Sequence, residues 1–226
     1  MSLSPDRPLA GILAPLFALR AEHDLGIGDV GALRELIDWA AEQGFALVQL
    51  LPINETGGDF SPYNAISSVA LDPLTIEIGP DRIADLPGHF YTDEVSKEID
   101  PGLVAELSRG PVQYARVKAL KMRLLARAFE WFTSQSWTRN DARGRAFRAF
   151  CKSEAAWLED YALFRVLIDE NGGSEKWDEW PRSSAAQARR GRGWRSAGWR
   201  RSAGSWRWRC VSPCIGNSSR GSSGAR

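Results

Sequence analysis

Three side chains in one short polar segment have the chemistry to contact a sugar. In Ser61-Pro62-Tyr63-Asn64, a tyrosine lies between a proline and an amide. Pro62 fixes its own φ and biases Ser61 toward extended backbone, so the position of Tyr63 should be well defined. A tyrosine offers a flat apolar face and a hydroxyl, which match the CH face of a sugar ring and its surrounding hydroxyls. The same features also fit a tyrosine that only fills the loop against a sheet.

The segment follows a short apolar run that must position it. Residues 46–51 are almost continuously apolar, which predicts a strand buried on both faces. Pro52 marks the exit of the strand, because it cannot donate a ladder hydrogen bond. The Asn, Gly and Asp residues that follow favour turns. A buried strand that ends in a polar loop with one aromatic is how α/β enzymes build the rim of a ligand site.

The residues upstream predict a β–α–β unit. Residues 11–17 indicate a first strand, and Asp29 can cap a helix over residues 30–43. Gly44 is a candidate for the end of that helix. The next strand begins at Ala46, so we expect two parallel neighbouring strands with a right-handed crossover.

The second half of the chain is predicted to be mainly helical. Residues 74–78 indicate a short extended piece, and an acidic stretch broken by Pro and Gly follows to residue 110. Pro111 fits the first turn of a helix that runs to residue 132. A second helical region, residues 142–170, ends at Asn171-Gly172-Gly173. One side of this region is expected to pack in the core: Phe147, Phe150, Cys151, Trp157, Leu158, Tyr161, Phe164 and Ile168.

Charge divides the chain into two unlike parts. The 226 residues have a net charge of +1, but residues 182–226 contain 11 of the 29 basic residues, all Arg, and none of the 28 acidic ones. Residues 1–181 therefore hold 18 basic and 28 acidic side chains. We expect a body over 1–181 and a disordered Arg/Gly/Ser/Trp-rich tail over 182–226. Out-of-frame translation of a GC-rich gene is the favoured origin of the tail, and a genuine arm is the alternative.

Motifs along the body resemble one enzyme family. Residues 50–53 (LLPI) and 61–73 (SPYNAISSVALDP) resemble the strand and loop signature of the 4-α-glucanotransferases, also called amylomaltases or disproportionating enzymes. Asp72 stands where that family more often has Asn. Further segments fit in family order, so the resemblance covers most of residues 10–181: residues 11–16, 25–29, 30–43, 157–164 and 177–181.

The resemblance implies an α/β fold, a (β/α)₈ TIM barrel with helical insertions, in proteins several hundred residues longer than this one. A closed barrel needs eight parallel strands and typically about 250 residues. Two barrel strands are recognisable here, so we expect an incomplete N-terminal portion of the barrel.

The resemblance also implies the chemistry. Such enzymes transfer α-1,4-glucan segments between maltooligosaccharides by a retaining double displacement, with a carboxylate nucleophile and an acid/base carboxyl. The family's catalytic carboxylates lie on later strands, and no residue of this chain can be matched to them. The chain contains no Asp or Glu after Glu179. We therefore expect no catalytic residues and an inactive isolated chain, with substrate contacts limited to Ser61, Tyr63 and, more loosely, Asn64.

Other candidate sites are weak. Glu55 and Asp59 share a loop, but a solvated loop face is favoured over a catalytic pair. His23 and His89 are expected at the surface. Cys210 and Cys214 lack a nearby His, so no metal is expected, and no cofactor is implied. No apolar run approaches the roughly 20 residues of a membrane span. The N-terminus lacks a signal-peptide pattern, so the cytoplasm is the expected location.

Two other functions remain open. The chain could be a non-catalytic α-glucan-binding remnant that uses Tyr63. The Arg and Trp residues of the tail could instead bind nucleic acid, because Arg neutralises phosphates and Trp stacks on bases. We regard nucleic acid as the less favoured partner and a maltooligosaccharide or α-glucan as the expected one.

Overall fold

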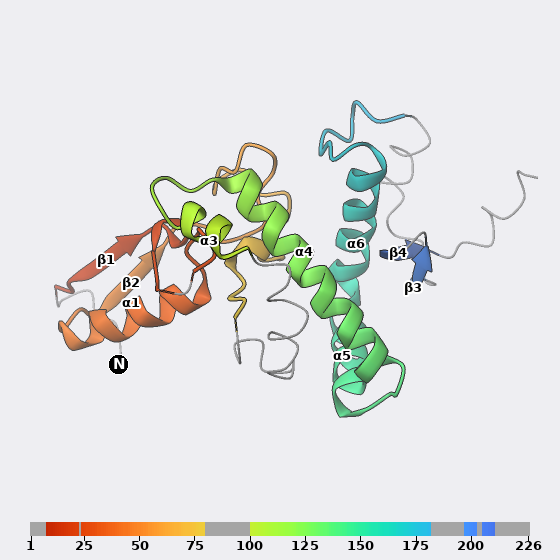
Figure 1. Ribbon diagram of the computed structural model, residues 1–226, viewed down its shortest axis with the longest axis horizontal. Helices are drawn as coiled ribbons and strands as arrows, with labels where there is room; N and C mark the ends of the chain where they lie inside the picture. Colours follow the sequence, from red (N-terminus) through yellow and green to blue (C-terminus); the bar gives the residue numbers. More distant parts are fainter. Residues whose placement is uncertain (1–7, 23, 80–99, 182–196, 203–204, 211–226) are drawn as a thin grey trace, which may run out of the picture. The chain divides into compact units, whose positions relative to one another are not determined.

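The computed structural model describes residues 8–22, 24–79, 100–181, 197–202 and 205–210. The chain divides into two compact units, residues 1–144 and 145–226. The first unit contains a small sheet, a long loop and several helices. Figure 1 shows the order of the elements along the chain.

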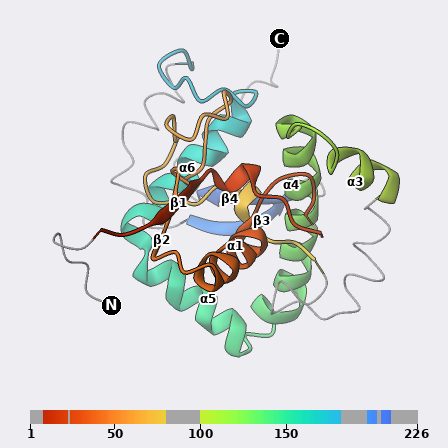
Figure 2. The ribbon, with the colours of Figure 1, turned by 90° about the vertical axis from the view of Figure 1, so that its left-hand side faces the viewer.

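The first unit begins with the predicted β–α–β unit. Strand β1 (Gly11–Ala14) pairs in parallel with β2 (Leu47–Leu50), and helix α1 (Val30–Glu42) lies between them in sequence. Asp29 caps α1 by accepting a hydrogen bond from the Gly31 N–H at 3.0 Å. Gly44 has a φ of +81°, as the predicted helix end requires. Helix α1 runs beside the strand pair in two perpendicular views (Figures 1 and 2).

The prediction that the second strand is buried on both faces is wrong for this structure. Ala14 is buried and Ile12, Val48 and Leu50 are half-buried, whereas Leu13 and Leu47 are 59% and 47% exposed. Exposure thus alternates along both strands, as it does when one sheet face is covered and the other is open. Among the described residues the sheet has two strands, so the barrel of the expected fold is not closed.

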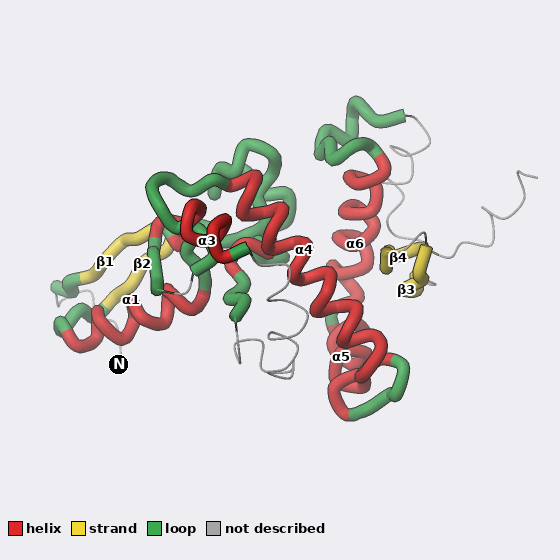
Figure 3. The backbone as a smooth tube through the Cα atoms, in the orientation of Figure 1, coloured by secondary structure: helices red, strands yellow, loops and turns green. Residues whose placement is uncertain are grey.

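The remaining elements of the first unit are loop and helix (Figure 3). The extended piece predicted at 74–78 is instead a 3₁₀ helix, η2 (Pro73–Thr75), because Asp72 caps it and Pro73 fixes its first φ. Helix α3 (Pro101–Leu107), capped by Asp100, lies in the stretch expected to be irregular. Helix α4 (Tyr114–Phe132) begins after Gln113 rather than at Pro111, and a π turn, η4 (Thr133–Trp137), continues it.

The apolar core of the first unit lies against α4, not against the sheet. Its buried members come from α3, α4, the loop after β1, and η2 with the segment that follows it: Leu25, Ile27, Leu74, Ile78, Leu107, Val117, Leu120 and Leu124. Lys121 lies on the same face of α4 and is fully buried. Its ammonium donates to Asp29 Oδ2 at 3.2 Å and to the carbonyls of Leu74 at 2.7 Å and Ile76 at 2.9 Å.

The second unit contains two helices where one region was expected. Helix α5 (Ala142–Ser153), which starts in the first unit, and α6 (Ala155–Glu170) are separated at Glu154. The glycines after Asn171 have φ values of +70° and +85°, so the predicted helix end is confirmed. Ile168 is buried, but Cys151 is half-buried and Phe150 is 46% exposed. The expected aromatic core is therefore only partly formed in the described residues.

The tail contains two paired strands where disorder was predicted. Strands β3 (Ala197–Ser202) and β4 (Ser205–Cys210) pair antiparallel, with Trp199 opposite Trp208. Residues 206–209 of β4 alternate Trp and Arg, a period of two that suits a strand. Residues 182–196, 203–204 and 211–226, as well as His23, His89 and Cys214, lie outside the described residues. No helix in the described part of the chain has the length and hydropathy to span a membrane.

Replacing Lys121 by Met should strongly destabilise the first unit. The change keeps the apolar stem but leaves Asp29 Oδ2 and the carbonyls of Leu74 and Ile76 without the ammonium. Removing one partner of a buried ion pair costs about 3–5 kcal/mol. Lys118→Met, the same change three residues earlier, loses only a contact over the Phe60 ring and should cost about 1 kcal/mol or less. Urea unfolding followed by circular dichroism measures both, and equal losses would refute the role of Lys121.

The contribution of Lys121 to the free energy of unfolding should change with pH in the alkaline range. Burial lowers the pKa of its ammonium below the ordinary 10.5, although the charges of Asp29, Asp24 and Asp72 act in the opposite direction. Between the folded and unfolded pKa values, the unfolded chain binds more protons, so stability rises with pH in that interval. The stability of the wild type relative to Lys121→Met should therefore increase toward pH 10.5. A decrease would show that the folded pKa is raised instead.

Candidate functional site

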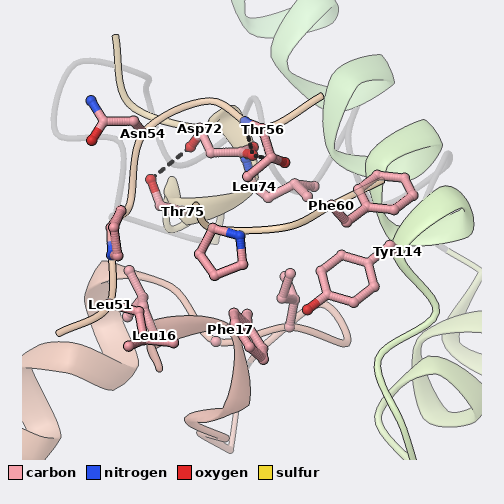
Figure 4. Close-up of a pocket in the computed structure, with 14 residues that line it drawn as sticks. Leu16, Phe17, Leu51, Asn54, Thr56, Phe60, Asp72, Leu74, Thr75 and Tyr114 are labelled. Carbon is pink, nitrogen blue, oxygen red and sulfur yellow. Dashed lines mark hydrogen bonds between the residues drawn. The ribbon is translucent and has the colours of Figure 1, made fainter. Parts of the chain in front are cut away.

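A pocket opens in the first unit where β1 and β2 end. Leu16 and Phe17 follow β1, and Leu51 and Pro52 follow β2, so the pocket lies at the carboxyl ends of two parallel strands. In α/β barrels and open α/β sheets, ligands bind at this end of the strands. The hollow measures about 450 Å³ when the open solvent at its mouth is counted. Its other lining residues are Ile27, Gly28, Asn54, Thr56, Phe60, Pro62, Asp72, Leu74, Thr75 and Tyr114 (Figure 4).

The loop after β2 folds back on itself and forms one wall of the pocket. Isolated antiparallel bridges join Asn54 to Leu71 and Thr56 to Ala65. Asp72 N donates to the carbonyl of Ile53 at 3.0 Å, which brings the end of the loop back to its start. The polar side chains of the pocket, from Asn54 to Thr75, therefore come from one folded-back segment.

Asp72 is the polar centre of this wall. Its Oδ2 accepts from the N–H and the hydroxyl of Thr56 at 3.2 and 3.0 Å, and its Oδ1 accepts from Leu74 N at 2.9 Å (Figure 4). The Thr75 hydroxyl donates to the Asp72 carbonyl at 2.7 Å. Burial raises the pKa of Tyr114 across the pocket, and the negative charge of Asp72 raises it further. A carboxylate engaged on both oxygens is a structural acceptor rather than a free acid or base.

A second carboxylate holds the loop after β1 that supplies Ile27 and Gly28. The Arg20 guanidinium donates to both oxygens of Asp24, at 2.7 and 2.8 Å. Burial by itself would raise the pKa of Asp24, but the hydrogen bonds from Arg20 and from the N–H groups of Gly26 and Ala21 outweigh it, so the pKa is lowered. At Gly28 a Cβ would lie 2.0 Å from the Leu16 carbonyl, so no larger residue fits there.

The predicted sugar contacts lie on the tip of the loop beside the pocket. Tyr63 is 75% exposed, so it does not fill the loop against the sheet. Asp59 shapes the tip: its carboxylate accepts from Asn64 Nδ2 at 2.9 Å and from Ser61 N at 3.1 Å, and these bonds lower its pKa. The structure thus brings Ser61, Tyr63 and Asn64 together. None of them lines the pocket itself, where Phe60 and Pro62 lie instead.

The prediction of a solvated loop face holds for one of the two loop carboxylates and is wrong for the other. Asp59 is exposed, as expected, but Glu55 is 1% exposed and does not lie on a solvated face. Glu55 N and O pair with Ala70 and Ile66, which places this residue inside the folded-back loop. Within the described residues, no cluster of three or more His, Cys, Asp or Glu side chains is arranged to hold a metal ion.

Sequence reasoning missed Phe60 and Tyr114. Phe60 has a φ of +54°, and its ring stacks on Tyr114 with the centroids 4.9 Å apart. Nothing in the local sequence predicts a left-handed Phe. The Asp72-Pro73 pair, in contrast, is a recognisable start of a helical turn and could have indicated the role of Asp72.

Comparisons with known proteins agree on one family. The sequence profile of a family described as 4-alpha-glucanotransferase matches residues 14–198. A 4-alpha-glucanotransferase from Chlamydia pneumoniae is 37% identical over 181 residues, covering 80% of this chain and 32% of that protein. One from Thermus thermophilus is 34% identical over 157 residues, covering 69% of this chain and 28% of that protein.

A solved structure shares the fold. Amylomaltase from Streptococcus agalactiae in complex with acarbose matches with a TM-score of 0.57 and 22% identity, over 81% of this chain and 36% of that chain. The chain thus spans about a third of the length of these three proteins. The profile match continues past Pro181, the predicted boundary between the body and the Arg-rich tail.

Replacing Asp72 by Asn should destabilise the pocket wall, even though the resemblance places Asn at this position. An amide keeps one acceptor oxygen, so either Thr56 N or Leu74 N would face an NH₂ group. A buried unsatisfied donor costs about 1–3 kcal/mol in unfolding free energy. Asp59→Asn, the same change at an exposed site, should lose much less. Urea unfolding tests the pair, and an unchanged midpoint for Asp72→Asn would contradict the assigned hydrogen bonds.

Proposed function

We propose that this chain, which belongs to the 4-alpha-glucanotransferase family, forms the α-glucan-binding edge of an enzyme that transfers α-1,4-glucan segments between maltooligosaccharides. Family membership itself rests on the profile match over residues 14–198 and on the relatives described above.

The exposed ring of Tyr63 carries the proposal. It projects from a loop tip that Asp59 braces, beside a pocket at the carboxyl ends of two parallel strands. An exposed aromatic ring on a braced loop can stack on a sugar, while Ser61 and Asn64 supply polar groups for its hydroxyls. The apolar floor formed by Leu16, Phe17 and Leu51 suits the CH face of a second ring.

The chemical step requires groups that we assign to no residue here. A retaining transfer needs a carboxylate nucleophile and an acid/base carboxyl about 5–5.5 Å apart across the scissile bond. Asp72 is the carboxylate that lines the pocket, and both its oxygens already accept hydrogen bonds. The family likeness supports a double displacement in the whole enzyme, whereas the residues of this chain bind and orient the glucan. We infer that the isolated chain is inactive.

Acarbose should bind to the chain through Tyr63. Acarbose occupies the related amylomaltase from Streptococcus agalactiae, which makes it a suitable probe. Tyr63→Ala should weaken binding by about tenfold or more, as expected for loss of an aromatic anchor worth above about 1.4 kcal/mol. Trp39→Ala removes another exposed aromatic, on α1 and outside the pocket, and should leave the affinity unchanged. Isothermal titration calorimetry separates these outcomes; equal affinity of Tyr63→Ala and the wild type would reject the binding role.

Incubation of the purified chain with maltotriose should release no glucose and form no longer maltodextrins. Binding without transfer is the result expected of a glucan-binding edge, and it is also what the alternative of a non-catalytic remnant predicts. High-performance anion-exchange chromatography measures the products. Disproportionation by this chain would show that its own carboxylates complete a catalytic centre.

A further inference from the structure

Phe60 adopts an unusual backbone conformation next to the predicted sugar contacts. Its φ of +54° lies in the left-handed region, which bulky residues rarely occupy. Such conformations persist where the surrounding structure holds them, and they cluster at ligand sites. Phe60 N donates to the Gly57 carbonyl at 3.2 Å, which closes the turn immediately before Ser61.

The Phe60 side chain joins the loop tip to α4. Its ring stacks on Tyr114, the first residue of that helix, at 4.9 Å and 19°. Lys118, one turn further along α4, places its Nζ 5.7 Å from the centre of the Phe60 ring. Phe17, after β1, meets Tyr114 edge to face at 6.0 Å. Figure 4 shows Phe60 and Tyr114 together at one side of the pocket.

The hydrogen bonds of the tip serve a different purpose. Asp59 binds Ser61 and Asn64, Asn64 N donates to the Ser61 carbonyl at 3.0 Å, and Gly57 N donates to the Asn64 carbonyl at 3.2 Å. These bonds join loop residues to one another, so they fix the shape of the tip. The stack between Phe60 and Tyr114 instead fixes where the tip lies relative to α4.

We propose that Phe60 is a positioning residue for glucan binding, which holds Tyr63 in place through the Phe60–Tyr114 stack. This inference rests on the proposed function. Tyr63 follows Phe60 by three residues, and the intervening Pro62 has a fixed φ. A short, braced connection transmits the position of the Phe60 ring to the backbone of Tyr63, so the sugar meets a preorganised loop and less order is lost on binding.

Four variants test the proposal by calorimetry with acarbose. Phe60→Asn removes the ring but suits a positive φ, and should weaken binding about threefold to tenfold, the range expected for an aromatic pair. Tyr114→Leu should have a similar effect. The double variant should be no weaker than the single ones, because both remove the same stack. Phe60→Tyr keeps the ring and should bind acarbose with wild-type affinity. Wild-type binding by Phe60→Asn, or additive losses in the double variant, would overturn the proposal.

Hydrogen exchange separates this role from the proposed function and from general stability. In Phe60→Asn, amides of residues 61–66 should exchange faster while those of residues 117–124 in α4 remain protected. Faster exchange in both segments would mean that the ring supports the whole fold, and unchanged exchange in both would mean that it holds nothing; either result contradicts the proposal. If the wild type itself fails to bind acarbose, the proposed function fails, and the exchange pattern alone decides the role of Phe60.

Discussion

The burial of one ammonium group determines how the first unit is assembled. A charge in an apolar interior is tolerated only when it is paired and hydrogen-bonded. Lys121 meets that condition with three acceptors, which come from the cap of α1 and from the turn after the long loop. The three bonds join α4 to acceptors at defined positions, which apolar contacts by themselves do not do. The constraint therefore ties α4 to both the β–α–β unit and the pocket wall.

The site depends on this constraint through two short paths. Lys121 and Tyr114 are seven residues apart on α4 and share a face, so fixing the one orients the other toward Phe60. Lys121 also binds the carbonyl of Leu74, whose N–H is held by Asp72, and Asp72 in turn holds Thr56. A helix outside the sheet thus positions both the polar wall of the pocket and the loop that presents Tyr63.

The elements that the sequence predicted well are those set by local chemistry. Asp29 caps α1, and Gly44 ends it, because a cap and a positive φ need particular residue types. The parallel pairing of β1 and β2 follows from that unit. The sequence did not decide whether Tyr63 is exposed or packs against the sheet. The grouping of Ser61, Tyr63 and Asn64 followed from their adjacency in the sequence.

What the sequence could not predict depends on tertiary contacts. The left-handed φ of Phe60 is held by a ring 54 residues away in sequence, at Tyr114. The burial of Glu55 results from the loop folding back, which polarity alone does not reveal. Lys121 lies among Val117, Leu120 and Leu124. A lysine on such an apolar stripe is a sequence signal for a buried, paired ammonium. The pairing of β3 with β4 was hidden by a composition that suggested disorder.

The central claim is that the carboxyl ends of β1 and β2, with the loop that follows β2, form a glucan-binding surface positioned by α4. A titration of the isotope-labelled chain with acarbose, followed by amide NMR shifts, tests it most directly. We expect saturable shifts concentrated at residues 54–64 and at the start of α4, around Tyr114. Shifts confined to residues 145–226, or none at saturating acarbose, would contradict it.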